Sequence, residues 1–411
     1  MKLVFHIAAE DSAIVMDSPD QGVKGIVMEP VGFWSDSINC RSTRLMMSYA
    51  GKLKDGVIEG TFFQRGFKIP LILHKGEKKV NRPQTTVPPF PYNQESVIIS
   101  NDSVSLAGTL TVPEQVDGSV PVVVLVSGSG LQSRDEELFE HKPFAVMADY
   151  LARNGIASLR YDDRGFGESK GDVINATTAD FAADARMVME WLKSSGRFGK
   201  TGIIGHSEGG QIAYMLGAEA NPPDFIISVA GPSVKGSRTI AFQNKNALLK
   251  SGIDTITANN FEVAIEKAFN YKLTHQKDTL ITDSLIASLY PQYNQNTFTA
   301  HLSDMLKNML VSETSSPWMT YFLGYDPCDD MKNLKIPVFI IYGEKDKQVP
   351  PYLNLEPARK YVPGAKTVSY PGLNHLMQHA VTGEVEEYSS IEETISPDVL
   401  ADITTFINTL K

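Results

Sequence analysis

The sequence predicts an α/β protein in which a small antiparallel β domain precedes a mostly parallel sheet flanked by helices. From Val97 onward, short apolar runs alternate with amphipathic stretches of helical period, which is typical of a mostly parallel sheet. Residues 1–75 instead carry short β-like segments separated by Gly, Asp, Ser and Pro. A length of 411 residues exceeds what one hydrophobic core usually fills, so more than one structural part is expected.

Changes in composition place the boundaries between these parts. The small β domain takes residues 1–75, with segments at 3–7, 13–16, 44–49, 57–64 and 67–74. A Pro-rich linker at 76–94 favours an extended chain. The α/β core takes 95–232 and 333–411, with apolar runs at 120–126, 157–161, 202–204, 225–229, 338–342 and 367–370. Residues 233–332 contain helical segments and no convincing strand, so they are expected to form a helical cap insertion.

Helix-ending residues support this division of the core. Gly155 and Gly196 follow two amphipathic stretches and are expected to end them as C-caps. The last helix is expected to begin with Ser396 as N-cap and Pro397 as its first residue.

Composition and charge exclude several functions. The hydrophobic content of 42% and charged content of 21% are those of an ordinary soluble globular protein. A net charge of -10, with no dense Lys/Arg run outside 75–79, argues against a nucleic-acid partner. The two cysteines, Cys40 and Cys328, give neither a disulfide framework nor a metal-ligand spacing.

The N-terminus MKLVFHIAAE is short for a signal peptide and far too short for a membrane span. As given, the chain is expected to be soluble and cytoplasmic, with no integral membrane segment. A β-like sequence begins at Lys2. If an upstream leader has been removed, a periplasmic or secreted location is expected instead.

The loops that follow the apolar runs carry the chemistry. In open α/β sheets ligands bind outside the carboxyl ends of the strands. The segments found there are SGSG, DDRGFG, GHSEGG, GEKD and PGLNH, in chain order. Within GHSEGG, residues Gly205 to Gly209 match G-x-S-x-G, between a strand-like run and a helical stretch, as this nucleophile elbow requires. The sequence therefore predicts Ser207 as a catalytic nucleophile, on a turn that the two glycines make possible.

A serine hydroxyl needs an adjacent base, and that base needs a partner that fixes its tautomer. Around a G-x-S-x-G elbow these follow in the order serine, acid, histidine. Asp346 and His375 fit this order, so we assign His375 as general base and Asp346 as the acid that orients it.

Three residues compete for these roles. Glu344 is the second choice for the acid, on the same loop but closer to the strand end. His379 is the nearest competitor to His375 and is otherwise an ordinary surface histidine. His206 is expected to pack beneath the site rather than to act as the base.

Acyl transfer also needs donors where the oxyanion forms. The backbone N–H of Glu208 is one candidate, and Ser129 in SGSG is the other, with Gly130 and Leu131 as alternatives. A phosphate-binding role for this glycine-rich turn is weakly supported because neither a GxGxxG motif nor a P-loop is completed. The DDRGFG loop is expected to be architectural, with its charges pairing locally.

Together these motifs resemble the α/β-hydrolase superfamily over residues 95–411. Within it, SGSGLQSRDE, RYDDRGFGESKG and GHSEGG are similar to bacterial esterases and to dienelactone-hydrolase-like or peptidase-like proteins with an N-terminal β domain. The resemblance implies an α/β-hydrolase fold and a carboxylesterase acting on small to medium acyl esters without metal or cofactor. Such relatives are often exported. The sequence departs from them at Leu131, where proline is expected.

Trp318 and Tyr321, in an aromatic segment before the 338–342 run, are candidates for the substrate pocket, although packing of the cap onto the sheet explains such aromatics equally well. A serine peptidase or aminopeptidase with the same triad is the alternative enzyme. A glycan- or lipid-binding protein with a vestigial hydrolase domain is the alternative of another class. Retention of Ser207, Asp346 and His375 argues against it. Periodicity does not set the oligomeric state.

Overall fold

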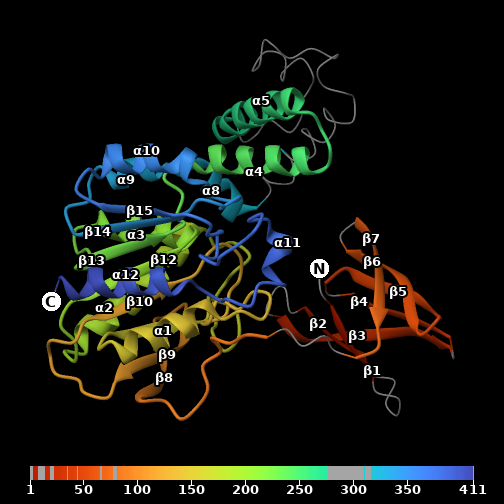
Figure 1. Ribbon diagram of the computed structural model, residues 1–411, viewed down its shortest axis with the longest axis horizontal. Helices are drawn as coiled ribbons and strands as arrows, with labels where there is room; N and C mark the ends of the chain where they lie inside the picture. The colour runs from red at the N-terminus through yellow and green to blue at the C-terminus, as the bar shows by residue number, and fades with distance from the viewer. Residues whose placement is uncertain are drawn as a thin grey trace. The chain divides into compact units, whose positions relative to one another are not determined.

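The computed structural model describes residues 3–7, 14–18, 23–34, 36–43, 45–64, 67–76, 81–275, 310 and 316–410 (Figure 1). Two compact units divide the chain. One consists of Met1–Pro83, Glu137–His141 and Tyr388–Glu392. The other consists of Gln84–Glu136, Lys142–Glu387 and Glu393–Lys411, and it holds every residue to which the sequence assigns chemistry.

The first unit is built on a seven-stranded antiparallel sheet in simple chain order. Its strands are β1 (Val4–Ile7), β2 (Ile14–Ser18), β3 (Val23–Trp34), β4 (Ser37–Ser42), β5 (Met47–Lys54), β6 (Val57–Gln64) and β7 (Phe67–His74). Alternate residues of β2 and β4 are buried, so one face of the sheet covers a small core that includes Met16, Cys40 and Tyr49. The Tyr49 hydroxyl donates to the carbonyl oxygens of Ile58 and Leu71, which fixes β6 and β7 to this core.

The second unit is built on an eight-stranded sheet of order β15-β14-β13-β12-β10-β11-β9-β8. The strands are β8 (Tyr92–Ser100), β9 (Ser105–Pro113), β10 (Val122–Val126), β11 (Ala157–Tyr161), β12 (Thr201–His206), β13 (Phe225–Val229), β14 (Val338–Gly343) and β15 (Lys366–Tyr370). From β11 to β15 all neighbours are parallel, whereas β8 and β9 pair antiparallel. This is an α/β-hydrolase fold, and β8 begins inside the stretch expected to be linker.

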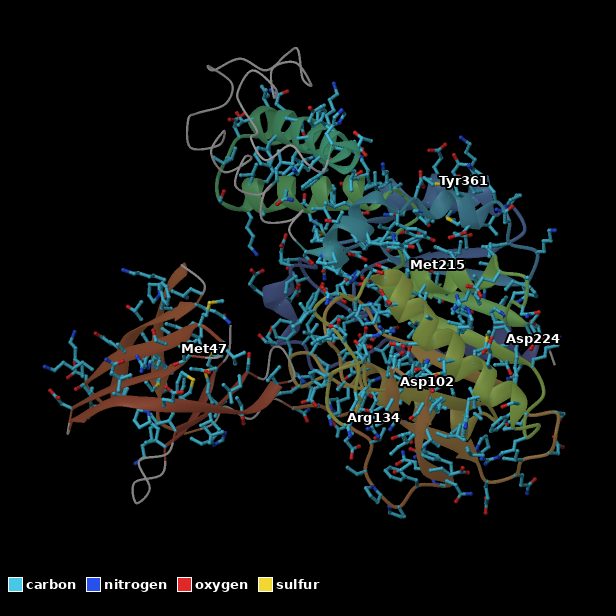
Figure 2. All side chains as sticks on the ribbon, turned by 180° about the vertical axis from the view of Figure 1, so that it is seen from behind. Met47, Asp102, Arg134, Met215, Asp224 and Tyr361 are labelled. Carbon is cyan, nitrogen blue, oxygen red and sulfur yellow. The ribbon has the colours of Figure 1, made fainter. Side chains whose placement is uncertain are left out.

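Helices cover both faces of this sheet, because alternate residues of its strands point to opposite sides (Figure 1). Val122, Val124 and Val126 of β10 pack toward α2 (Thr178–Ser194), α3 (Glu208–Gly217) and α10 (Pro351–Tyr361). Val123 and Leu125 pack toward α1 (Pro143–Arg153) and α12 (Pro397–Asn408). Met215 and Tyr361, labelled in Figure 2, pack against the first of these cores.

The helix-ending residues behave as predicted. Gly155 and Gly196 have φ of 75° and 62° just after α1 and α2, a conformation that glycine adopts without strain. Ser396 precedes α12, and Pro397 is its first residue.

The cap insertion is described in part. Its helices are α4 (Gly236–Lys250), α5 (Thr255–Thr274), α8 (Pro317–Gly324) and α9 (Pro327–Met331). Phe261 and Phe269 of α5 share a core of their own with Ala241 of α4 and Leu323 of α8. The predicted cap residues 276–309 and 311–315 lie outside the described residues. The short helix α11 (Val385–Tyr388) lies between β15 and α12 in the chain.

Candidate active site

Ser207 lies on a tight turn between β12 and α3. Its backbone has φ 53° and ψ -117°, a region that L-residues other than glycine seldom occupy. A Cβ on Gly205 would overlap the Gly209 carbonyl, and one on Gly209 would overlap the carbonyl oxygen of Val126. Both glycines are therefore needed for the turn to form, and the turn leaves Ser207 half-buried at the carboxyl edge of the sheet.

The structure brings Asp346 and His375 together. His375 Nδ1 lies 2.7 Å from Asp346 Oδ2, and both side chains are buried. Asp346 Oδ1 accepts two further hydrogen bonds, from the backbone N–H groups of Gln348 (2.7 Å) and Val349 (2.8 Å). The carboxylate is thus held by its own loop in an orientation that presents one oxygen to the imidazole.

The competing residues lie elsewhere. Glu344 Oε1 accepts from the Ser369 hydroxyl at 3.2 Å, in an exposed position. His379 pairs with Glu393 at the surface, Nδ1 to Oε2 at 2.9 Å. His206 is buried, with its ring centroid 4.9 Å from that of His375. Among the described residues, neither Ser207 Oγ nor His375 Nε2 has a hydrogen-bond partner, so both atoms remain available at the site.

The two predicted oxyanion donors have unpaired N–H groups within the described part of the chain. Glu208 is the first residue of α3, where backbone N–H groups have no partner inside the helix and the helix dipole favours negative charge. In the loop after β10, the N–H of Gly128 donates to Glu136 and that of Gln132 to Asp163. Ser129, Gly130 and Leu131 lie between these two anchored positions, and none of their N–H groups is paired with a described residue.

Sequence analysis missed how this loop is held. Asp163 accepts from the Gln132 N–H at 2.8 Å and from the Ser127 hydroxyl at 3.1 Å. Asp162 accepts from the backbone N–H and the guanidinium of Arg134. Burial raises the pKa of the Asp163 carboxyl to about 8, despite hydrogen bonds that lower it. Asp162 therefore pairs with Arg134 in the loop after β10 rather than within its own segment, and the expectation of local pairing is wrong.

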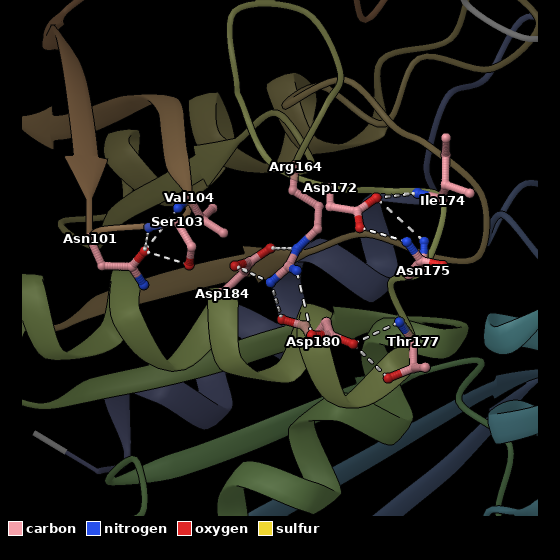
Figure 3. A network of polar contacts seen from close by, with 10 residues as sticks. All are labelled: Asn101, Ser103, Val104, Arg164, Asp172, Ile174, Asn175, Thr177, Asp180 and Asp184. Atoms are coloured by element: carbon pink, nitrogen blue, oxygen red, sulfur yellow. Dashed lines mark hydrogen bonds and ion pairs between the residues drawn. The ribbon is translucent and has the colours of Figure 1, made fainter.

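Arg164 of the same segment binds α2 instead (Figure 3). Its Nε and Nη2 donate to the two carboxylate oxygens of Asp184 at 2.7 and 2.8 Å, and its Nη2 also donates to the Asp180 carbonyl. The side chain of Asp180 in turn accepts from the N–H and hydroxyl of Thr177, forming a capping box at the start of α2. This ion pair fastens the loop after β11 to the helix that follows it.

The side chain of Glu208 points away from solvent and links three elements. It accepts from the Thr178 hydroxyl at 2.6 Å and from the Trp318 indole N–H at 2.8 Å. Burial raises the pKa of this carboxyl, although these donors act in the opposite direction. Trp318 therefore connects the cap helix α8 to the residue that follows Ser207.

An open groove of about 780 Å³ lies beside α8. Tyr321 lines it, whereas Trp318 does not. Its walls are Thr177, Leu273, Pro317, Thr320, Tyr321, Gly324, Tyr325, Asp326, Asp329 and Asp330.

Two further structural findings concern the described ranges only. No three His, Cys, Asp or Glu side chains converge there as metal ligands would. Likewise, the helices described include none with the length and apolar character needed to cross a bilayer.

Comparison with known proteins gives the family. The model of the X-Pro dipeptidyl-peptidase (S15) family matches residues 102–355, which is more than half of the chain. The chain belongs to this family. Its S15 membership and the α/β-hydrolase fold make the protein a serine hydrolase.

Relatives of this S15 member include two bacterial esterases. It is 24% identical over 334 residues to esterase EstD of Thermotoga maritima, an alignment that covers 80% of this chain and 68% of the relative. It is 23% identical over 292 residues to the bifunctional esterase/perhydrolase DCH of Acinetobacter calcoaceticus, covering 69% of this chain and 91% of the relative.

Solved structures similar to the S15 member include an esterase and a peptidase. The match to a Pyrococcus furiosus esterase has a TM-score of 0.45 at 16% identity and covers 81% of this chain and 99% of the other. The match to a Mycobacterium smegmatis proline iminopeptidase has a TM-score of 0.47 at 15% identity and covers 77% of this chain and 98% of the other.

Proposed function

We propose that the protein hydrolyses carboxylic esters of small to medium acyl groups, with Ser207 as nucleophile, His375 as general base and Asp346 as its orienting acid. The observation that carries the proposal is the 2.7 Å contact between His375 Nδ1 and Asp346 Oδ2, two buried groups in loops at the edge of the sheet where Ser207 lies. A carboxylate in this position keeps the imidazole proton on Nδ1 and leaves Nε2 to accept a proton from serine.

The proposed reaction proceeds through an acyl-enzyme. Ser207 Oγ attacks the acyl carbonyl while His375 takes its proton, and His375 then passes that proton to the leaving alcohol. The N–H groups of Glu208 and Ser129 stabilise the oxyanion, and losing one such donor typically lowers turnover about 10²–10³-fold. Water activated by His375 then releases the acid. None of these steps calls for a metal or an organic cofactor.

The substrate pocket is proposed to lie along α8. Tyr321 supports this because its side chain lines the open groove there. The indole N–H of Trp318 donates to Glu208 and is not available to a substrate. We therefore propose that Trp318 contributes the face of its ring to the pocket wall. A small-molecule ester is the proposed partner.

Ester hydrolysis is favoured over peptide hydrolysis because two relatives that align with more than two thirds of the chain carry esterase in their names. A peptidase with the same triad is the second candidate, and the name of the S15 family, X-Pro dipeptidyl-peptidase, gives it weak support.

A substrate panel distinguishes these two functions. Wild type and Ser207→Ala are compared on p-nitrophenyl esters from acetate to palmitate, and on aminoacyl and X-Pro p-nitroanilides. We expect serine-dependent turnover of short and medium esters and little turnover of anilides. Turnover of anilides alone would make the protein a peptidase, and activity retained in Ser207→Ala would exclude Ser207 as the nucleophile.

A further inference from the structure

Two ionisable side chains outside the proposed triad, Glu136 and His206, lie buried beneath the Ser207 turn. Glu136 Oε1 lies 2.8 Å from His206 Nδ1, and the two residues are only 5% and 8% exposed. The same oxygen of Glu136 accepts the N–H of Gly128 at 2.7 Å. On the other side of the imidazole, His206 Nε2 lies 3.0 Å from the carbonyl oxygen of His375.

These contacts fix the protons on His206. A carbonyl oxygen only accepts hydrogen bonds, so Nε2 must carry a proton to bind the His375 carbonyl. Glu136 Oε1 accepts the Gly128 N–H, and an ionised carboxylate, which can only accept hydrogen bonds, accepts from Nδ1 as well. With protons on both nitrogens, His206 is an imidazolium paired with the Glu136 carboxylate.

The surrounding charges support this state. Burial lowers the pKa of His206, but the charge and hydrogen bond of Glu136, the His375 carbonyl and the charge of Asp346 together raise it above its ordinary value. The neighbouring ionisable groups are Glu136, Asp346 and His375, whose ring lies 4.9 Å away. A buried ion pair of this kind is poor evidence for a stabilising role, because desolvation offsets much of its attraction.

The pair joins the three chain segments that the proposed reaction uses. Gly128 belongs to the loop after β10 that holds the proposed oxyanion donor Ser129, here called the oxyanion loop. His206 directly precedes the proposed nucleophile, and His375 is the proposed base. The backbone of Glu136 has φ 51°, a left-handed conformation that is unfavourable for glutamate. A strained backbone therefore presents the buried Glu136 side chain to Gly128 and His206, and His206 extends the contact to His375, a combination typical of functional sites.

We propose that Glu136 and His206 form a positioning ion pair that holds the oxyanion loop and the His375 loop against the Ser207 turn, and that its charge sets the rate of turnover. The inference rests on the proposed roles of Ser207 and His375. Neither Glu136 nor His206 touches the reacting atoms in this scheme. Both act through Gly128, the nucleophile turn and the backbone of His375.

The substitution Glu136→Gln removes the negative charge of this side chain while keeping its size and shape. Glutamine keeps an oxygen that can accept the Gly128 N–H, and its volume is almost unchanged. Beside a neutral amide, however, His206 loses the charge that keeps both of its nitrogens protonated, so one of its two hydrogen bonds is lost. The matched control is Asp184→Asn, which neutralises a buried carboxylate paired with Arg164 in the architectural contact between the β11 loop and α2.

The test measures kcat and KM on the best p-nitrophenyl ester, thermal unfolding, and the ring-nitrogen shifts of ¹⁵N-histidine-labelled protein. We expect Glu136→Gln to lower kcat about 10- to 100-fold with KM within about 2-fold, as small displacements of reacting groups do. Asp184→Asn is expected to lower the melting temperature while leaving kcat per folded enzyme unchanged. In wild type both ring nitrogens of His206 should be protonated, and in Glu136→Gln one should not.

The outcomes separate this inference from the proposed function. Wild-type kcat in Glu136→Gln, with Ser207→Ala inactive, would overturn the positioning role alone. Activity retained in Ser207→Ala would overturn both proposals. A neutral His206 ring in the wild-type spectrum would overturn the ion pair even if the Glu136 variant did not fold.

Discussion

The two sides of Ser207 are held in place by different means. On the side of the proposed base, Asp346 and His375 lie in short loops after the adjacent strands β14 and β15, and the Asp346 carboxylate is fixed by backbone N–H groups of its own loop. On the side of the proposed oxyanion donors, the loop after β10 is held by side chains that include Asp163, from the loop after β11. Local contacts therefore fix the Asp346 carboxylate, whereas contacts distant in sequence fix the loop after β10.

The largest expected effect tests the base side. Asp346→Asn should lower kcat on esters about 10⁴-fold, because an amide no longer keeps the imidazole in the correct tautomer. Glu344→Gln is the matched control on the same loop, and turnover within about 2-fold of wild type is expected because Glu344 contacts Ser369 rather than His375. A large loss in Glu344→Gln alone would assign the acid to Glu344.

An intermediate effect tests the oxyanion side through pH. The pKa of Asp163 is about 8 in the folded protein, against an ordinary value of 3.8, chiefly because of burial. The folded protein therefore holds a proton that the unfolded chain releases, and the free energy of unfolding should fall as pH rises from about 4 to about 8. Asp163→Asn mimics the protonated form, so its melting temperature should depend less on pH across this window.

Thermal unfolding from pH 5 to pH 9 checks this, with Asp102→Asn at an exposed carboxylate as control. A slope in Asp163→Asn as steep as that of wild type would assign the pH dependence to another group.

The smallest effect concerns the link between the cap and the oxyanion side. Trp318→Phe removes the indole N–H that donates to Glu208 but keeps an aromatic ring. Because the Thr178 hydroxyl still donates to Glu208, we expect kcat to fall less than about 10-fold and stability by about 1–3 kcal/mol. Trp191→Phe, in α2, is the control because the Trp191 indole N–H has no partner among the described residues. Equal losses in kcat from Trp318→Phe and Trp191→Phe would show that the hydrogen bond from Trp318 to Glu208 has no specific effect on turnover.

The same contrast explains what could be predicted from the sequence. The apolar runs predicted the parallel sheet, and the loops after them named Ser207, Asp346 and His375, because a loop that follows a strand directly has a defined place at the sheet edge. Glu136 stands between Asp135 and Glu137, well after the end of β10, and no pattern in that acidic run distinguishes it. Its burial depends on contacts with Gly128 and His206, which only the folded chain brings together.

The N-terminal sheet gives a second example. Strand β4 has the sequence SINCRS, with too few aliphatic residues to signal a strand, and β3 is interrupted by Gly25, Pro30 and Gly32. Neither segment was predicted. Both are strands because antiparallel pairing with β2 and β5 satisfies their backbone groups, whatever their β propensity.

The strained backbone of Ser207 lowers the stability of the fold at the residue proposed to carry the activity. A residue other than glycine at φ 53° and ψ -117° destabilises the fold by about 1–3 kcal/mol. Glycine at this position would relieve that strain and remove the hydroxyl in the same step. If Ser207 is the nucleophile, as proposed, a directed-evolution experiment that selects only for heat resistance would favour inactive variants, and an activity screen in every round would be needed to keep the serine.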